Sequence, residues 1–525
     1  MDDMARVGFV DRFLSATRGG VVSEADLRAL QGAAKKLTGP LAQHAARLLD
    51  YVSFDRELDP QERREVAALL GQLGATPLQL TRLHTLPACN LQIQHLDLDV
   101  DLHREPARCQ VKLQLGKGAP ERAVLEANEQ LLHVRSVHAG HREVEFKQDN
   151  GRLTFAGHGA KTITVEYDLD SRSKLDGTGL IARGNEKLTL TWPERVCDLF
   201  PGDTRPGLAV TASVTLHASR ETVLQGTGKR VAGGPGWSTF ELTTAAPPHA
   251  IGFYAAERGE RLRLEDEQGP VYVSRRASKA IDQLRERHLE VAAATGRFME
   301  KLFGPTPLGP MEAVIEVPAA LGGMENARAI LMERASSRQV YEGARTTAHE
   351  VIHMWWGNAV RPKSHADLWL SEGFTTYFTM RALAPGIGGV NYRTMLSRSV
   401  DGAVEDLRLR WKSDAKYPLR PDAEAITNTA IFDEVTYELG AWVLLAMEQQ
   451  LGRARFDQML AAWFDHSKKL AVSTDDFFAF AERRSGESFA AIRERWVDHL
   501  PPVAEFKRES NRLLEKLAPP GRYDR

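Results

Sequence analysis

The sequence has few cysteines and no long apolar run. It holds three cysteines in 525 residues, Cys89, Cys109 and Cys197, and none belongs to a CxxC pair. This number and spacing exclude a disulfide framework, so we expect reduced, structural thiols. No stretch has the length of an apolar membrane span, and the first residues, MDDMARVGFVDRF, lack the apolar core of a signal peptide. The sequence therefore predicts a cytoplasmic protein that does not bind a membrane.

Charge of one sign is not in excess either. Lysine and arginine together number 68 and aspartate and glutamate 70, which leaves a formal net charge of −2. Proteins that bind the phosphate backbone usually carry an excess of basic residues, so we expect no nucleic-acid partner. With 42% hydrophobic and 26% charged residues, the chain has the composition of a globular protein. Its length predicts two or three domains.

The spacing of apolar residues changes along the chain. Near the start, the S-x-x-D pattern at Ser23 and the Asp59-Pro60 pair are helix-start signals. Later segments such as LQIQHLDLDVDL alternate apolar and polar residues, as half-buried strands do, and the last large part has mainly helical spacing. The expected fold class is α+β with several domains. We expect a helical N-terminal extension, an antiparallel β-sandwich-like domain, a mainly α domain and a polar tail, at residues 1–82, 83–275, 276–500 and 501–525.

An HExxH motif, HEVIH, lies at residues 349–353 in a stretch that predicts a helix. Four residues make about one helical turn, so His349 and His353 project from the same face and can share one cation. Glu350 lies about 100° further round the helix, where it can reach a metal-bound water without being a ligand. The alternative is a solvated helix face with two incidental histidines. The apolar, tryptophan-rich surroundings disfavour it, because unpaired imidazoles are costly to bury.

A catalytic zinc usually has three protein ligands and keeps a fourth position open for water. Glu372, in DLWLSEGFTTYF, follows His353 after eighteen intervening residues, which leaves room for a turn and a second helix. The alternative is a glutamate on a helix surface, but the flanking Leu370 and Phe374 make the segment too apolar for that. We therefore predict one Zn²⁺ per chain, held by His349, His353 and Glu372.

These motifs resemble those of the M1 family of zinc aminopeptidases, a branch of the gluzincins. The resemblance rests on HExxH, eighteen residues and a glutamate, with WWGN after the first motif and WLSEGF around the third ligand. Upstream, GGMEN at 322–326 is similar to the family's G-x-M-E-N exopeptidase motif. Downstream, Tyr437 in VTYELGAWVLLAMEQQLG resembles the family's catalytic tyrosine segment. A weaker match, LFPGDTRPG at 199–207, is similar to FPxxDxP, and the resemblance covers roughly residues 83–500.

The resemblance implies an aminopeptidase with a thermolysin-like catalytic domain, acting on peptides with a free amino terminus. In this role Glu350 is the general base and Tyr437 the donor to the oxyanion. Glu325 would bind the α-ammonium group of the substrate. Taken alone, GGMEN is more typical of a plain glycine turn with an exposed glutamate, and its position before HExxH favours the binding role. The remaining expected substrate-binding residues are Gly322, Gly323, Met324 and Asn326. Tyr437 taken alone could be a helix-packing tyrosine.

The chain departs from the family pattern at several positions. Met354, Ser371 and Leu439 stand where the family more often has Gln, Asn and Lys, and none of these carries direct chemistry. The chain ends soon after residue 500, so the large C-terminal helical domain of many relatives is expected to be absent. Asn358 is expected to support the site, and Trp192-Pro193 to line the substrate pocket.

Two other functions stay open on the sequence. One M1 branch also hydrolyses epoxides, but Thr429 and Phe432 stand where that branch has an aspartate and a second tyrosine. Other M1-like proteins are noncatalytic scaffolds that have lost zinc ligands or the base. This chain keeps all of them, so peptide hydrolysis is favoured.

Overall fold

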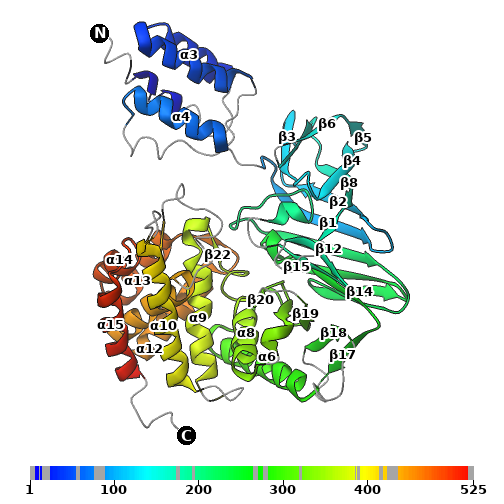
Figure 1. Ribbon diagram of the computed structural model, residues 1–525, viewed down its shortest axis with the longest axis vertical. Helices are drawn as coiled ribbons and strands as arrows, with labels where there is room; N and C mark the ends of the chain where they lie inside the picture. Colours follow the sequence, from blue (N-terminus) through cyan, green and yellow to red (C-terminus); the bar gives the residue numbers. More distant parts are fainter. Residues whose placement is uncertain are drawn as a thin grey trace. The chain divides into compact units, whose positions relative to one another are not determined.

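The computed structural model forms two compact units, Met1–Asn90 and Leu91–Arg525 (Figure 1). The residues that it describes are 6, 8–10, 12–14, 24–54, 60–75, 89–149, 151–172, 178–191, 195–263, 270–275, 282–318, 322–337, 339–384, 386, 391–412, 418–421 and 435–517. The expected boundaries after residues 82 and 275 lie outside the described residues. No helix among the described residues is long and apolar enough to span a membrane.

The helices of the first unit include α2 (Glu24–Ala34), α3 (Gly39–Phe54) and α4 (Pro60–Gln72). Helix α4 starts at Pro60, whose fixed φ suits the first helical position. Ser23 and Asp59, the other expected start signals, lie outside the described residues. The helices enclose an apolar core whose fully buried members include Phe9, Phe13, Leu30, Leu48, Leu70 and Leu73.

The second unit begins with a β-rich region built on an eight-stranded sheet. Its strand order is β14-β15-β12-β1-β2-β8-β4-β5. These strands are β1 (Ile93–Asp101), β2 (Ala107–Leu115), β4 (Leu132–Ala139), β5 (Arg142–Val144), β8 (Thr162–Leu169), β12 (Val210–His217), β14 (Lys229–Gly234) and β15 (Trp237–Ala246). Buried and exposed residues alternate along the whole of β2, a pattern typical of a half-buried strand. All pairs are antiparallel except β1 with β12, which are joined by a connection long enough for a parallel crossover.

Two smaller sheets complete the β-rich region. One has the order β13-β16-β11-β10-β9 and the other β3-β7-β6. Their strands are β3 (Arg122–Glu126), β6 (Phe146–Asp149), β7 (Arg152–Ala156), β9 (Ser171–Arg172), β10 (Gly179–Arg183), β11 (Glu186–Leu190), β13 (Thr222–Gly226) and β16 (Phe253–Glu257).

A further five-stranded sheet, in the order β17-β18-β19-β21-β20, carries the GGMEN segment at its edge. Its strands are β17 (Gly259–Arg263), β18 (Val271–Arg275), β19 (Ala313–Val317), β20 (Gly323–Met324) and β21 (Ala329–Glu333). Strand β19, AVIEV, is buried at every position, as an apolar run between parallel neighbours should be. The short strand β20 pairs antiparallel with β21 and ends directly before Glu325.

The rest of the second unit is mainly helical, so the chain has a β-rich region followed by a helical one. Its helices are α6 (Asp282–Phe303), α7 (Arg334–Ser337), α8 (Val340–Ile352), α9 (Trp369–Leu383), α10 (Tyr392–Lys412), the π-helical turn η6 (Val435–Leu439), α11 (Gly440–Leu451), α12 (Arg453–Ser467), α13 (Thr474–Ser485), α14 (Ala490–Trp496) and α15 (Val503–Leu517). Every residue of α9 is buried, which explains why WLSEGFTTYF has no polar face. Helix α15 lies in the expected polar tail and buries Phe506 and Leu514.

Candidate metal centre

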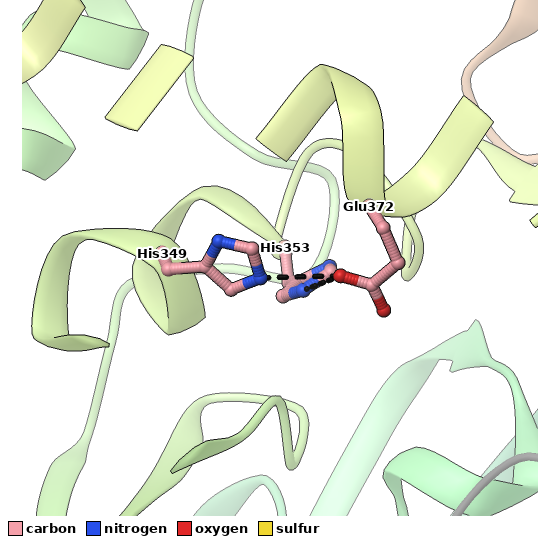
Figure 2. Close-up of side chains that lie close together, drawn as sticks. All are labelled: His349, His353 and Glu372. Atoms are coloured by element: carbon pink, nitrogen blue, oxygen red, sulfur yellow. Dashed lines mark hydrogen bonds and ion pairs between the residues drawn. The ribbon is translucent and has the colours of Figure 1, made fainter. Parts of the chain in front are cut away.

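The two histidines of the HExxH motif and Glu372 meet at one point, with the histidines on α8 or its end and Glu372 on α9 (Figure 2). His349 Nε2 lies 3.1 Å and His353 Nε2 3.3 Å from the same oxygen, Glu372 Oε2. Two ligand atoms about 2.0–2.1 Å from a tetrahedral zinc lie about 3.3–3.4 Å apart, so this spacing fits that ion. The three residues bring two imidazoles and a carboxylate together, which is a common catalytic zinc ligand set.

The orientation of His353 is fixed from behind. Its Nδ1 lies 2.9 Å from the carbonyl oxygen of Trp356, which can only accept, so Nδ1 carries the hydrogen. Nε2 is therefore the nitrogen that would bind a metal, after losing any proton it carries, as in most metal-bound histidines. The hydroxyls of Ser371 and Thr375 also lie 3.4 and 3.3 Å from Nδ1. Ser371, which stands where the M1 family more often has Asn, therefore places a small polar group behind a candidate metal ligand.

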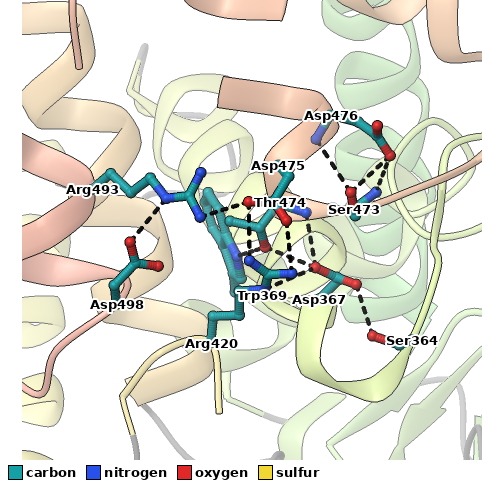
Figure 3. A network of polar contacts seen from close by, with 10 residues as sticks. All are labelled: Ser364, Asp367, Trp369, Arg420, Ser473, Thr474, Asp475, Asp476, Arg493 and Asp498. Atoms are coloured by element: carbon teal, nitrogen blue, oxygen red, sulfur yellow. Dashed lines mark hydrogen bonds and ion pairs between the residues drawn. The ribbon is translucent and has the colours of Figure 1, made fainter. Parts of the chain in front are cut away.

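The start of α9 is held by a polar network around Asp367 (Figure 3). The buried Asp367 carboxylate accepts hydrogen bonds from the Thr474 backbone N–H and hydroxyl, both 2.8 Å long. Trp369 Nε1 donates to the same hydroxyl at 3.0 Å, and Ser364 donates to Asp367 at 2.7 Å. These contacts tie the first turn of α9 to the start of α13. The backbone that carries Glu372, in that first turn, is fixed by them.

The electrostatic environment of the site favours a cation. Burial alone would lower the pKa of His353, but carboxylates, first among them Glu372, raise it to about 10. Burial favours protonated Glu372, yet His353 and His349 lower its pKa to about 2. Burial lowers the pKa of His349 and so favours its neutral, metal-binding form. The carboxylates that favour a protonated His353 would also attract a divalent metal ion, which could take the place of that proton.

Glu350 lies beneath the GGMEN edge. A Cβ added to Gly323 would come within 2.2 Å of Glu350 Oε1, so only glycine lets the edge strand pass this close. Burial raises the pKa of Glu350 well above its usual range, and His353 offsets part of that rise. Ligand atoms of Glu325, Glu350 and His353 all lie within 4.8 Å of one another. The structure thus brings the expected base and the expected ammonium-binding residue together beside the ligands.

Glu325 is held from two sides. Asn358 Nδ2 donates a 2.9 Å hydrogen bond to the backbone carbonyl of Glu325. His249 Nε2 lies 3.4 Å from Glu325 Oε1, and both side chains are nearly buried. Burial would raise the pKa of Glu325, but His249 and His353 lower it, so the carboxylate stays ionised. Asn358 thus supports the site as expected. His249 was not predicted, because no motif marks it.

The other GGMEN residues shape this edge. Gly322 has a φ of 71°, in the left-handed region that favours glycine. Its backbone N–H donates a 3.1 Å hydrogen bond to Glu333 Oε2 on the neighbouring strand. Met324 and Asn326 are both buried, with 2% of each exposed. These two side chains therefore support the edge from the protein interior.

Tyr437 lies against His349. The two rings stack at 5.8 Å between centroids with an interplanar angle of 26°. Gly373 and Gly440 bring α9 against this segment, because a Cβ on Gly373 would lie 2.8 Å from the Gly440 backbone. The close contact between Gly373 and Gly440, which was not predicted from the sequence, sets how near the segment with Tyr437 lies to α9.

Comparison with known proteins shows a family match in the part of the chain that holds these residues. Residues 288–496 match the peptidase family M1 domain. This part of the chain is therefore similar to the peptidase family M1 domain. All three metal-binding candidates, Glu350 and Tyr437 lie inside the M1 domain, and Glu325 lies there too.

Relatives of the M1 domain include named aminopeptidases. Aminopeptidase M1-B of Oryza sativa subsp. japonica is 30% identical over 225 residues, which cover 40% of this chain and 25% of that protein. Probable aminopeptidase 2 of Sulfurisphaera tokodaii is 28% identical over 220 residues, covering 40% and 28%. The matched part of this chain thus spans about a quarter of the length of these relatives.

Solved structures share the fold over more of the chain. An M1 zinc metallopeptidase from Deinococcus radiodurans gives a TM-score of 0.61 at 21% identity, covering 82% of this chain and 94% of the other. Yeast LTA4 hydrolase gives a TM-score of 0.67 at 17% identity, covering 79% and 68%. The similarity therefore includes part of the chain before the M1 domain. Trp192, Pro193, Thr429 and Phe432, which were singled out in the sequence, lie outside the described residues.

Proposed function

We propose that this protein is a zinc-dependent aminopeptidase that hydrolyses the amino-terminal peptide bond of peptides. One observation carries the proposal: the partly buried His349, the buried His353 and Glu372 converge on one point, with Glu350 and Glu325 beside them. One zinc per chain would be held by His349, His353 and Glu372. When bound, zinc lowers the pKa of a coordinated water and polarises a carbonyl group.

The chain's own residues would move the proton and stabilise charge. Glu350 takes a proton from the attacking water and returns it to the leaving amine. Its buried position suits this task, since a carboxylate with a raised pKa accepts a proton more strongly. The Tyr437 hydroxyl donates a hydrogen bond to the carbonyl oxygen as negative charge develops there.

Glu325 would select the amino terminus. Its pKa is lowered, so it is a carboxylate at neutral pH and can bind the positively charged α-amino group of a peptide. The Gly322-Gly323 backbone at the sheet edge would pair with the substrate main chain. A carboxylate fixed beside the ligands limits cleavage to the first peptide bond. Peptides with a free amino terminus are the proposed substrates, and a cytoplasmic location stays a prediction from the sequence.

Two alternatives stand beside this proposal. Yeast LTA4 hydrolase is among the similar structures, so an M1-type epoxide hydrolase is one of them. A noncatalytic scaffold is the other, and it is disfavoured because a scaffold has no need of a complete ligand set with a base beside it.

Matched substrates distinguish these functions. Purified protein is assayed with a panel of fluorogenic aminoacyl substrates, with their N-acetylated counterparts, and with an allylic epoxide. We expect turnover of the free-amine substrates alone, loss with a strong chelator and recovery with added zinc. Equal rates on free and acetylated substrates would indicate an endopeptidase, turnover of the epoxide alone would support the hydrolase, and a folded protein without stoichiometric metal or turnover would support the scaffold.

A further inference from the structure

The residue after the expected catalytic tyrosine, Glu438, is buried and fully engaged. Its side chain is 4% exposed, and its Oε1 accepts a 2.7 Å hydrogen bond from Arg345 Nη2. Its other oxygen accepts a hydrogen bond from the Ser399 hydroxyl. Trp442 Nε1 donates to that hydroxyl at 3.0 Å. The carboxylate is thus tied to α8 and α10 at once.

Arg345 belongs to the helix that carries the metal ligands. It precedes His349 by four residues on α8, which places both side chains on the same face of that helix. Its ion pair with Glu438 therefore connects the ligand helix to the turn that carries Tyr437. The two segments meet twice, at this pair and at the stacked rings of His349 and Tyr437.

The turn that carries Tyr437 is a π-helical segment, Val435–Leu439, and not a regular α-helix. Such turns contain one more residue than an α-turn and are held by their surroundings. Removing the extra residue from the turn would rotate the side chains before it by about 100°. An outside contact that holds this turn therefore fixes the direction of the Tyr437 side chain.

We propose that Arg345 is a positioning residue, whose ion pair with Glu438 holds the Val435–Leu439 turn and directs the Tyr437 hydroxyl toward the carbonyl under attack. This inference rests on the proposed aminopeptidase function, in which Tyr437 is the oxyanion donor. Arg345 itself does not touch the substrate. Its effect on turnover passes through Tyr437.

A double-mutant cycle tests this dependence. Arg345→Met should lower kcat about 10- to 100-fold, because misplacing a catalytic group by about 1 Å can cost that much. KM should change less than about threefold, since binding of the ground state is untouched. Tyr437→Phe should lower kcat about 10²- to 10³-fold, as for loss of one oxyanion donor. The double variant should be no slower than Tyr437→Phe alone, because the arginine then has nothing to position.

Arg398 provides a matched control. Arg345 and Arg398 both line a cavity of 160 Å³ beside His349. The Arg398 guanidinium instead lies 4.3 Å from the Tyr341 ring centroid and 3.5 Å from Glu342. Arg398→Met removes the same charge from the same cavity without touching Glu438. It should leave kcat within about twofold of wild type.

Hydrogen exchange gives a readout that does not depend on turnover. Backbone amides in residues 435–439 should exchange faster in Arg345→Met than in wild type. In Arg398→Met their exchange rates should equal those of wild type. Arg345→Lys should restore part of kcat, because it keeps the charge but loses the fork of the guanidinium. If Arg345→Met fails to fold, Arg345→Lys and Glu438→Gln carry the same comparison.

Two results would overturn the inference: losses that multiply fully in the double variant, or unchanged exchange at 435–439 when Arg345 is replaced. A wild-type protein that is inactive on free-amine substrates would instead overturn the proposed function. In that case the exchange measurement still decides whether Arg345 holds the turn.

Discussion

The candidate site has two halves that the chain builds in different ways. The proposed metal half, His349, His353 and Glu372, comes from α8 with its end and from α9, and a single helical turn sets the spacing of its histidines. The proposed substrate half, Glu325 and Tyr437, comes from a sheet edge and a π-helical turn that are far apart in the sequence. The first half depends on local helix geometry, and the second on how distant segments pack. Mutations should therefore separate metal binding from substrate handling.

The largest separation should come from Glu350, which touches both halves without being a ligand. Glu350→Gln should keep zinc but lower turnover about 10²- to 10⁴-fold, the range that a general acid-base group supplies. Glu372→Gln is the matched control, because it makes the same chemical change at a ligand and should lower zinc occupancy instead. Elemental analysis and steady-state kinetics on the two variants give the comparison. Near-normal kcat in Glu350→Gln would remove the base from this mechanism.

A smaller effect is expected at Glu325. Glu325→Ala should lower kcat/KM on free-amine substrates about 10- to 100-fold, if one charge-assisted hydrogen bond is worth about 1.5–3 kcal/mol. Its rate on N-acetylated substrates should stay at background, so the preference for the free amine shrinks. Zinc content should not change, because Glu325 is not among the three ligands. A wild-type preference that survives the substitution would assign amine recognition to another group.

The close contact between Gly373 on α9 and the Gly440 backbone joins the two halves, and a substitution at Gly373 can disrupt it. Gly373→Ala places a methyl group about 2.8 Å from the Gly440 backbone, which must move. We expect a loss of about 1–3 kcal/mol in the free energy of unfolding, as for other overpacked sites, with zinc retained. Gly296→Ala is the control, because Gly296 lies within α6 with open space at its Cβ position. That change should stabilise by about 0.5–1 kcal/mol. Chemical denaturation measures both, and equal effects would contradict the close helix contact.

The same division decides what could be predicted from the sequence. The HExxH spacing predicted that His349 and His353 share a face, and the structure brings Glu372 to them. Glu325 and Tyr437 were placed through a family resemblance, since nothing local shows that they approach the ligands. His249 could not be predicted, because its contact with Glu325 joins segments 76 positions apart in the sequence.

The fold divides in a similar way. Alternation predicted the strands of the β-rich region, and helical spacing predicted α8 and α9. Strand partners did not follow from spacing, so the parallel pairing of β1 with β12 was missed. The Arg345–Glu438 pair was missed too, because it joins residues 93 positions apart. Local periodicity determines elements, whereas packing determines which elements meet.

The smallest predicted effect is a proton released when zinc binds. In the metal-free protein the pKa of His353 is raised to about 10, so its imidazole is charged at pH 8. A metal-bound histidine must be neutral, so binding should release about one proton at pH 8 and fewer as the pH rises through 10. The pKa of His349 is lowered and that of Glu372 is about 2, so neither adds a proton.

Calorimetry of zinc binding in two buffers with different ionisation enthalpies measures this number. Glu350→Gln protein is the cleaner sample, because glutamine binds and releases no proton, whereas burial raises the pKa of Glu350. Among the carboxylates that raise the pKa of His353, Glu350 contributes least, so its removal should leave that imidazole charged at pH 8. The sign follows from the two pKa shifts: the His353–Glu372 ion pair stabilises the metal-free fold fully between about pH 4.5 and 6.5. This contribution is lost as the pH rises through 10, and also as the pH falls through 2. Zinc affinity should accordingly increase with pH over the same interval, because fewer protons compete for His353. Binding without proton release at pH 8 would show that His353 is already neutral, and that the neighbouring carboxylates do not hold a proton where zinc binds.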